Sequence, residues 1–146
     1  MARRVFFSFE YSDVSRAMVV RNSWVTTGRE AAGFVDAADF EKLERLGEAN
    51  VRQWIDSQLD GTSVTTVLVG ANTCASKWVN YEIEASKRRG SGLLGIDISQ
   101  IKNLAQQTTS RCGQIPAGYG FYLWFNDEGY KNIGSWIESA AQAAGR

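Results

Sequence analysis

The sequence contains no histidine among its 146 residues. Histidine is the commonest general base near neutral pH and the commonest metal ligand in proteins. Its absence excludes serine–histidine and cysteine–histidine hydrolases, and it excludes zinc sites that depend on histidine. We therefore expect no metal site in this chain.

Cysteine and proline are also scarce. The two cysteines, Cys74 and Cys112, are too few for a disulfide framework or a thiolate metal cage. We expect both to be reduced thiols in a cytoplasmic protein. The apolar run Val5–Phe9 is too short for a signal peptide and far too short to cross a bilayer.

The chain has no excess of either charge. Sixteen basic residues balance sixteen acidic ones, so the formal net charge is zero. A nucleic-acid or anionic-membrane partner would favour a basic excess, so neither is expected. The clearest basic run, 87–89, is typical of a solvated helix end.

Length and composition indicate one globular domain. A chain of 146 residues fits one buried core, and 44% hydrophobic with 22% charged residues is ordinary for a soluble protein. There is one proline and no low-complexity tract. We predict a single domain over residues 1–146.

Short apolar runs alternate with amphipathic segments along the chain. Helical spacing is clearest at 51–59 and 76–89, and it is also present near 14–21, 40–47 and 133–144. Residues 99–119 are weakly patterned. The predicted strands are Val5–Phe9, Gly33–Val35, Val64–Gly70, Leu93–Ile98 and Phe121–Phe125.

This alternation predicts an α/β fold, a five-stranded and mostly parallel sheet with helices on both faces. Ligands of such sheets bind outside the carboxyl ends of the strands, at a switch in strand order. The expected ligand-binding loops are therefore 9–13, 35–39, 70–76 and 98–101.

Common nucleotide-binding motifs are missing from these loops. There is no P-loop, and Gly90, Gly92 and Gly95 precede or interrupt a strand instead of following one. The central strand ends at Gly70-Ala71-Asn72, without the aspartate of a phospho-accepting receiver. The first loop is not hydroxyl-rich, as a flavin site would require. What remains is a site of carboxylates and aromatic rings.

Trp78 and Glu82 are the leading candidates for such a site. They are four residues apart on the helix after the central strand, so they share a face. Helical geometry predicts that Glu82 lies at the edge of the buried face, half shielded. The alternatives are a solvated glutamate that pairs with Lys77 or Arg88, and a Trp78 that only packs in the core.

Other candidates follow the first two strands. Phe9 and Tyr11 follow the first strand, where a core residue and a loop aromatic are the alternatives. Asp36 follows the second strand and could be a turn former. Arg21 and Asp36 are weaker substrate-binding candidates than Phe9, Tyr11 and Trp78.

Several blocks of this sequence resemble the TIR (Toll/interleukin receptor) family, and above all the TIR-like proteins of the bacterial Thoeris antiphage system. The likeness covers about residues 3 to 103. Enzymatic TIR domains carry a catalytic glutamate in a W-x-x-x-E pattern, which Trp78 and Glu82 match. The matching blocks are Arg4–Phe9, Val20–Trp24, Trp54–Asp56, Gly61–Val64, Val67–Gly70, Lys77–Glu84 and Gly92–Ile96.

The resemblance implies a flavodoxin-like TIR fold and cleavage of NAD with Glu82 as the catalytic residue. NAD is then a substrate, and no cofactor is expected. The product would be a cyclic ADP-ribose isomer that signals to a separate effector, since one small domain leaves no room for its own effector. Self-association through TIR contacts is also implied.

The residue set suits this chemistry. Nicotinamide leaves as a neutral molecule from a cationic pyridinium, so no general acid is needed. A fixed carboxylate can hold the ribose hydroxyls and stabilise the developing cation. Aromatic rings can sandwich the nicotinamide or adenine.

Two other functions stay open on the sequence alone. Many TIR domains are scaffolds without activity, and such a protein would release no nicotinamide. A nucleoside deoxyribosyltransferase-like enzyme would also use a glutamate on a flavodoxin-like sheet, and it would exchange bases between nucleosides.

Overall fold

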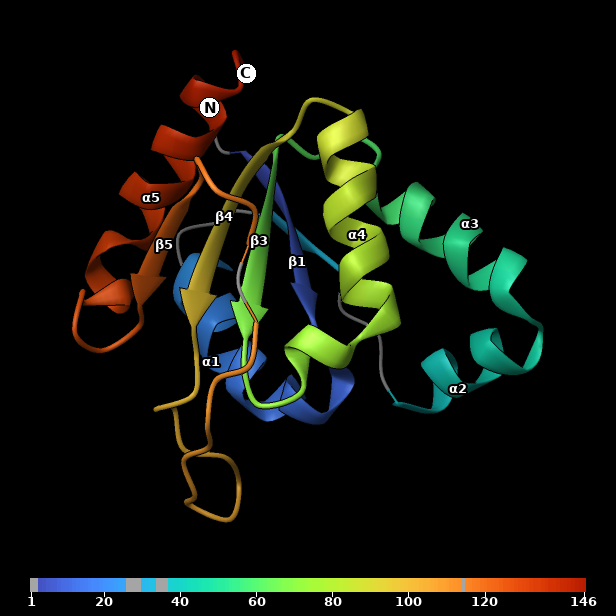
Figure 1. The fold of residues 1–146 in the computed structure, drawn as a ribbon, viewed down its shortest axis with the longest axis horizontal. Coiled ribbons are helices and arrows are strands. Elements are labelled where there is room, and N and C mark those ends of the chain that lie inside the picture. Colours follow the sequence, from blue (N-terminus) through green and yellow to red (C-terminus); the bar gives the residue numbers. More distant parts are fainter. Residues whose placement is uncertain (1–2, 26–29, 34–36, 114) are drawn as a thin grey trace.

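The fold is built around a central sheet of five parallel strands (Figure 1). The computed structural model describes residues 3–25, 30–33, 37–113 and 115–146. The strand order is β2-β1-β3-β4-β5, so the order reverses between β1 and β3. The strands are β1 (Arg4–Phe9), β2 (Glu30–Ala32), β3 (Val64–Val69), β4 (Gly92–Asp97) and β5 (Gly120–Leu123).

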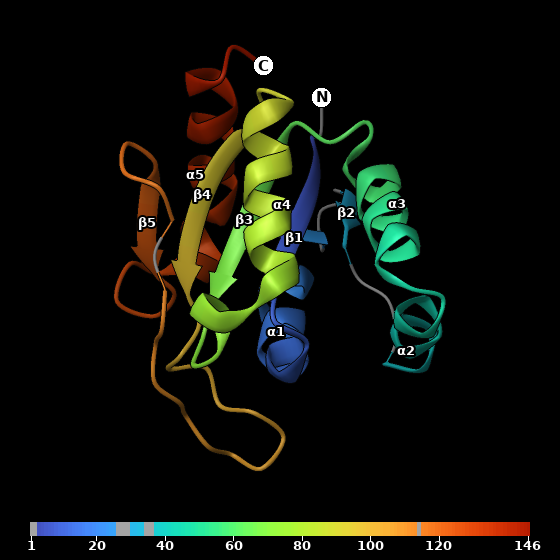
Figure 2. The same ribbon diagram turned by 45° about the vertical axis from the view of Figure 1, so that its right-hand side comes forward.

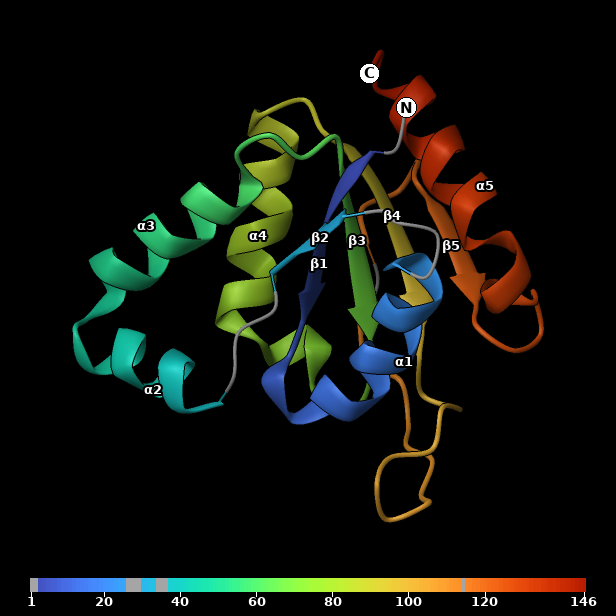
Figure 3. The ribbon, with the colours of Figure 1, turned by 180° about the vertical axis from the view of Figure 1, so that it is seen from behind.

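Helices cover both faces of this sheet. Helices α1 (Val14–Val25) and α5 (Gly129–Ala143) lie on one face, and α4 (Lys77–Arg88) lies on the other (Figures 1 and 3). Helix α3 (Glu48–Leu59) packs beside α4, and α2 (Ala37–Arg45) lies at the outer end of α3, away from the sheet (Figure 2). Within the described residues, no helix has both the length and the apolar character needed to cross a bilayer.

The core follows from strand alternation, because successive side chains point to opposite faces. Val5 and Phe7 of β1 pack in the cluster that α1 and α5 cover. Phe6 packs with Val51 and Ile55 of α3 on the opposite face. Ser8 has the same parity as Phe6, so it too faces the α4 side of the sheet.

The predicted α/β, flavodoxin-like fold is confirmed, with all of the strands parallel. The predicted position of the second strand is wrong. Residues 30–32 pair with β1, and Gly33 lies beyond the strand in a bend. Gly33 has a φ of 92°, a conformation that ends a strand rather than continuing it. Phe34 and Val35 lie outside the described residues.

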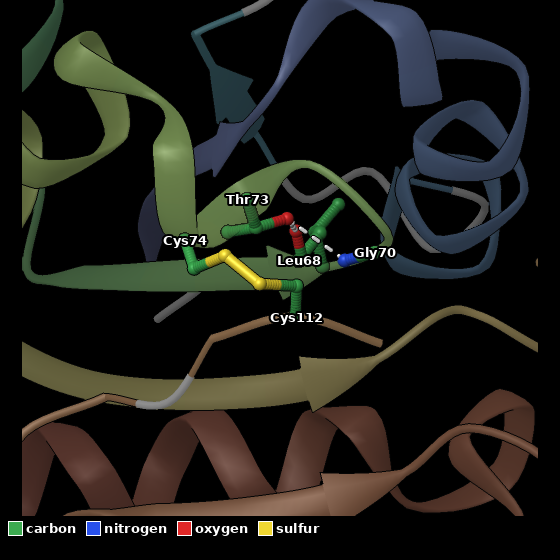
Figure 4. Close-up of a disulfide and its surroundings, with 5 residues drawn as sticks. All are labelled: Leu68, Gly70, Thr73, Cys74 and Cys112. Atoms are coloured by element: carbon green, nitrogen blue, oxygen red, sulfur yellow. Dashed lines mark hydrogen bonds between the residues drawn. A yellow bond between two sulfur atoms is a disulfide. The ribbon is translucent and has the colours of Figure 1, made fainter. Parts of the chain in front are cut away.

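The expectation of two reduced thiols is also wrong, because Cys74 and Cys112 form a disulfide (Figure 4). Cys74 lies in the short 3-10 helix η2 (Thr73–Ala75) before α4, and Cys112 lies in the long segment between β4 and β5. Both segments run along the carboxyl edge of the sheet, which brings their Cα atoms to 5.2 Å across 38 residues of sequence. The amide of Cys74 also donates to the carbonyl of Cys112 at 2.9 Å.

Candidate functional site

A small cavity lies at the carboxyl end of β1, where α4, α3 and α2 converge. Its volume is about 50 Å³. We call it the Glu82 cavity. It is lined by Phe7, Phe9, Glu10, Tyr11, Gly33, Phe40, Trp54, Ser76, Trp78 and Glu82.

Helix α4 carries the acid of this cavity. The helix begins where the Ser76 hydroxyl accepts a hydrogen bond from the amide of Val79 at 3.3 Å, as an N-cap residue does. Val79 and Ile83 bury the face of α4 that packs on β3 and β4. Glu82 lies on the adjacent stripe and projects toward β1.

Glu82 is more deeply buried than its helical position predicts. Only 7% of the residue is exposed, whereas the spacing alone indicated a half-shielded side chain. The aromatic rings that line the same cavity come from β1, the turn that follows it, α2, α3 and α4 itself. Ser8 of β1 donates a hydrogen bond from its Oγ to Glu82 Oε1 at 2.6 Å.

Burial raises the pKa of Glu82 to about 8, because the charged carboxylate loses its hydration, and the hydrogen bond from Ser8 opposes this rise. No Lys or Arg is bonded to this carboxylate within the part of the chain that the structure describes. A carboxyl group with this pKa is mostly protonated at pH 7 in the free protein, and a bound cation would favour its ionised form.

Aromatic rings form the rest of the cavity wall. Tyr11 and Phe40 stack with centroids 5.7 Å apart and planes 12° apart. Phe40 meets Trp54 edge-on at 6.3 Å, and Phe9 meets Tyr11 at 6.4 Å. On the other side, Trp78 lines the cavity at the start of α4. A cavity with these walls suits a flat, electron-poor ring.

The structure brings together four of the six residues predicted for the site. Phe9, Tyr11, Trp78 and Glu82 all line the Glu82 cavity. Arg21 is not among its lining residues and lies on α1, which covers the opposite face of the sheet. Asp36 lies outside the described residues. The functional roles of all six stay predictions.

Sequence reasoning missed Phe40 and Trp54 in the wall of this cavity and Ser8 as the hydrogen-bond partner of Glu82. Ser8 did carry a signal, since it is the one hydroxyl in the apolar run of β1. Phe40 and Trp54 resemble ordinary core positions of amphipathic helices, and nothing in their spacing separates a cavity wall from a core. Among the described residues, no group of three or more His, Cys, Asp and Glu is placed to hold a metal ion.

Comparison with known proteins identifies the family of this chain. Residues 6–103 match the family described as Thoeris protein ThsB, TIR-like domain. The chain belongs to the ThsB TIR-like family. The match spans β1 to β4 and therefore includes Ser8, Trp78 and Glu82.

A relative of this chain within the ThsB TIR-like family is a protein of Bacillus cereus (strain MSX-D12) named "Putative cyclic ADP-D-ribose synthase ThsB1". The two sequences are 38% identical over 139 residues, which cover 93% of this chain and 72% of the relative. The similarity therefore extends past residue 103 into the part of the chain that carries β5 and α5.

Proposed function

We propose that this chain cleaves NAD between nicotinamide and ribose and joins the ADP-ribose ends into a cyclic isomer. The observation that carries the proposal is the buried carboxylate of Glu82 in an aromatic cavity at the carboxyl edge of a parallel sheet. The name of the Bacillus cereus relative, a cyclic ADP-D-ribose synthase, supports the same product class.

The chemistry follows from the charge on the substrate. The nicotinamide ring of NAD is a pyridinium cation, and it leaves as a neutral base when the glycosidic bond breaks. Positive charge then passes to the ribose, which becomes oxocarbenium-like. An ionised Glu82 beside the ribose would stabilise that cation in a cavity from which most water is excluded.

Aromatic walls would favour a cyclic product over a linear one. After nicotinamide leaves, water and the substrate's own adenine or ribose groups compete for the cation. A folded-back substrate holds its internal nucleophile at a high effective concentration. The rings of Tyr11, Phe40, Trp54 and Trp78 could hold NAD in this folded form by stacking on its two bases.

Residues 1–146 act in this proposal as one TIR-like domain with NAD as substrate and no cofactor. The cyclic product would serve as a signal in antiviral defence, read by a separate effector protein. Self-association through TIR contacts would place several copies of the site together.

The test is to incubate the purified protein, alone and with lysate of phage-infected cells as activator, with NAD and to separate the products by mass spectrometry. We expect nicotinamide and a cyclic ADP-ribose isomer. Glu82→Gln should lower the rate by at least about 10²–10³-fold, because a preorganised charge facing the cation is lost.

Glu84→Gln is the matched control. Glu84 is exposed on the same helix, where it pairs with Lys87 at 3.7 Å, so this variant should keep its activity. Linear ADP-ribose as the sole product would reject the cyclase. Full activity in a folded Glu82→Gln protein would reject the site.

A further inference from the structure

Ser8 is a polar side chain at an otherwise apolar position. It lies in the middle of the sheet, opposite Val67 in the β1–β3 register, and its exposed fraction is zero. A buried hydroxyl without a hydrogen-bond partner destabilises the protein. The partner of the Ser8 hydroxyl therefore indicates the role of this residue. That bond, 2.6 Å long, goes to Oε1 of Glu82.

This bond makes the two carboxylate oxygens of Glu82 unequal. Oε1 is held by Ser8 from the sheet. Oε2 has no hydrogen-bond partner among the described residues, yet it is not among the buried polar atoms left unsatisfied. Glu82 lines the cavity, and its Oε2 is the carboxylate oxygen left without a hydrogen bond among the described residues.

We propose that Ser8 is the positioning residue of this site, holding Oε1 of Glu82 so that Oε2 is presented to the ribose of the substrate. This inference rests on the proposed function for the identity of the substrate, but the coupling between the two side chains does not. A carboxylate held at one oxygen cannot rotate away, and preorganised groups of this kind stabilise a transition state without further reorganisation.

The Ser8 hydroxyl also favours the ionised form of Glu82, because it donates to the carboxylate. Few other charged groups of the cavity act on the ionisation of Glu82. Glu10 is the second carboxylate of the cavity, and it accepts a hydrogen bond from the amide of Ser12 at 2.7 Å. Tyr11 adds a phenol to the wall.

Among the described residues of the elements packed against Glu82, no cation is hydrogen-bonded to its carboxylate. Strand β3 (VTTVLV) carries no charge. Helix α3 contributes Trp54 to the wall, and Asp56 of α3 accepts from the Tyr81 hydroxyl at 2.9 Å. On α4 itself, Lys77 pairs with Glu48.

Ser8→Ala tests the proposal directly. We expect the pKa of Glu82, followed by ¹³C NMR of its carboxyl carbon, to rise by about one to two pH units. NAD cleavage at pH 7 should fall about tenfold or more, and the loss should shrink as the pH is raised. Ser8→Cys, with a weaker donor of similar size, should give a smaller change of the same sign, and it provides a second reading if Ser8→Ala does not fold.

Ser86→Ala is the matched control. Ser86 is also a fully buried serine, but its hydroxyl donates to the backbone carbonyl of Glu82 at 2.7 Å and pairs with Thr65 at 2.6 Å. It should lower the melting temperature without moving the titration of Glu82.

An unchanged Glu82 titration in folded Ser8→Ala or Ser8→Cys protein would overturn the role of Ser8. So would an activity loss that is equal at every pH. If the titration shifts but neither wild-type nor variant cleaves NAD, then the coupling stands and the proposed substrate is wrong. The two failures are therefore distinguishable.

Discussion

Among the described residues, two carboxylates are buried at the carboxyl edge of the sheet, and their surroundings differ. Asp13, 3% exposed, pairs with the buried guanidinium of Arg16 at 3.1 Å. Burial raises the pKa of Asp13, and the positive charge of Arg16 opposes that rise. Glu82 has only a hydroxyl as its bonded neighbour. Asp13 is therefore compensated within the protein, whereas Glu82 lacks a positive partner that a cationic substrate would provide.

The pH dependence of activity should report this missing partner. With the pKa of Glu82 near 8 in the free protein, kcat/KM for NAD should rise through a midpoint near pH 8. The midpoint in kcat should lie lower, because the bound pyridinium favours the ionised carboxylate. Steady-state rates from pH 6 to 9 measure both, and a flat profile would contradict the assignment.

Glu82 should also lower the free energy of unfolding of the protein, by an amount that depends on pH. The pKa of Glu82 is about 8 in the folded protein, whereas that of a solvated glutamate is 4.5, so between these pH values the folded protein holds a proton that the unfolded chain releases. Below pH 4.5 the wild type loses no stability relative to a protein with a neutral side chain at this position. Its free energy of unfolding then falls, relative to that protein, as the pH rises to about 8.

Glu82→Gln should therefore be more stable than wild type near neutral pH, by an amount on the order of 2–3 kcal/mol at pH 7. That corresponds to a rise in Tm of several degrees at pH 7 and almost none at pH 4.5. Thermal melts of both proteins at these two values measure it. Glu84→Gln should give no such pH-dependent gain, and a Glu82→Gln protein that is less stable than wild type at pH 7 would be evidence against the buried, uncompensated charge.

Among the elements, α2 contributes one aromatic ring, that of Phe40, to the wall of the Glu82 cavity. The cavity volume of about 50 Å³ is far below the 300–1,000 Å³ typical of small-molecule sites. The rings of Tyr11 and Phe40 stack on each other in its wall. Figure 1 shows α2 at the outer end of α3, away from the sheet, and its residues Phe40 and Leu43 pack against the core cluster on the α3 side.

Phe40→Ala should raise the KM for NAD about three- to tenfold, since an aromatic pair contributes about 0.5–1.5 kcal/mol beyond its buried area. The melting temperature should change little, because Phe40 is only half-buried.

Leu43→Ala provides the comparison for this prediction. Leu43 is half-buried on the same helix but does not line the cavity. Equal effects of the two substitutions on KM would mean that Phe40 acts through the stability of α2 and not by stacking on a ring of the substrate.

The long segment between β4 and β5 is also held in place by its contacts with the rest of the protein. Arg16 donates from Nε to the carbonyl of Ile101 at 2.7 Å and from Nη2 to the carbonyl of Gln107 at 2.9 Å. The disulfide fastens Cys112 to the loop that precedes α4. A segment with almost no secondary structure is thereby held along the carboxyl edge of the sheet.

At the scale of the whole molecule, strand order decides where these elements meet. The chain starts at β1, moves to β2 at one edge, and then returns past β1 to β3, β4 and β5. This reversal leaves the carboxyl ends of β1 and β3 adjacent, with α1 and α4 leaving on opposite faces (Figures 1 and 3). Glu82 lies on the α4 side of that junction and Asp13 on the α1 side.

Local patterns in the sequence were enough to predict most of the element types, the parallel α/β class and the helix that carries Glu82. These depend on local periodicity, such as Val79 and Ile83 facing the sheet, and on an N-cap at Ser76. The short second strand was misplaced because its few residues lack a periodic signal, and its pairing with β1 is a long-range contact.

Long-range contacts set the depth at which Glu82 is buried, the bond from Ser8, the ring of Phe40 in the wall and the Cys74–Cys112 disulfide. Ser8 and Glu82 are 74 residues apart in the chain, and the cysteines are 38 apart. Periodicity reports which face of an element is covered. It does not report which side chain of another element covers that face, because that depends on strand order and on the packing of helices from distant parts of the chain.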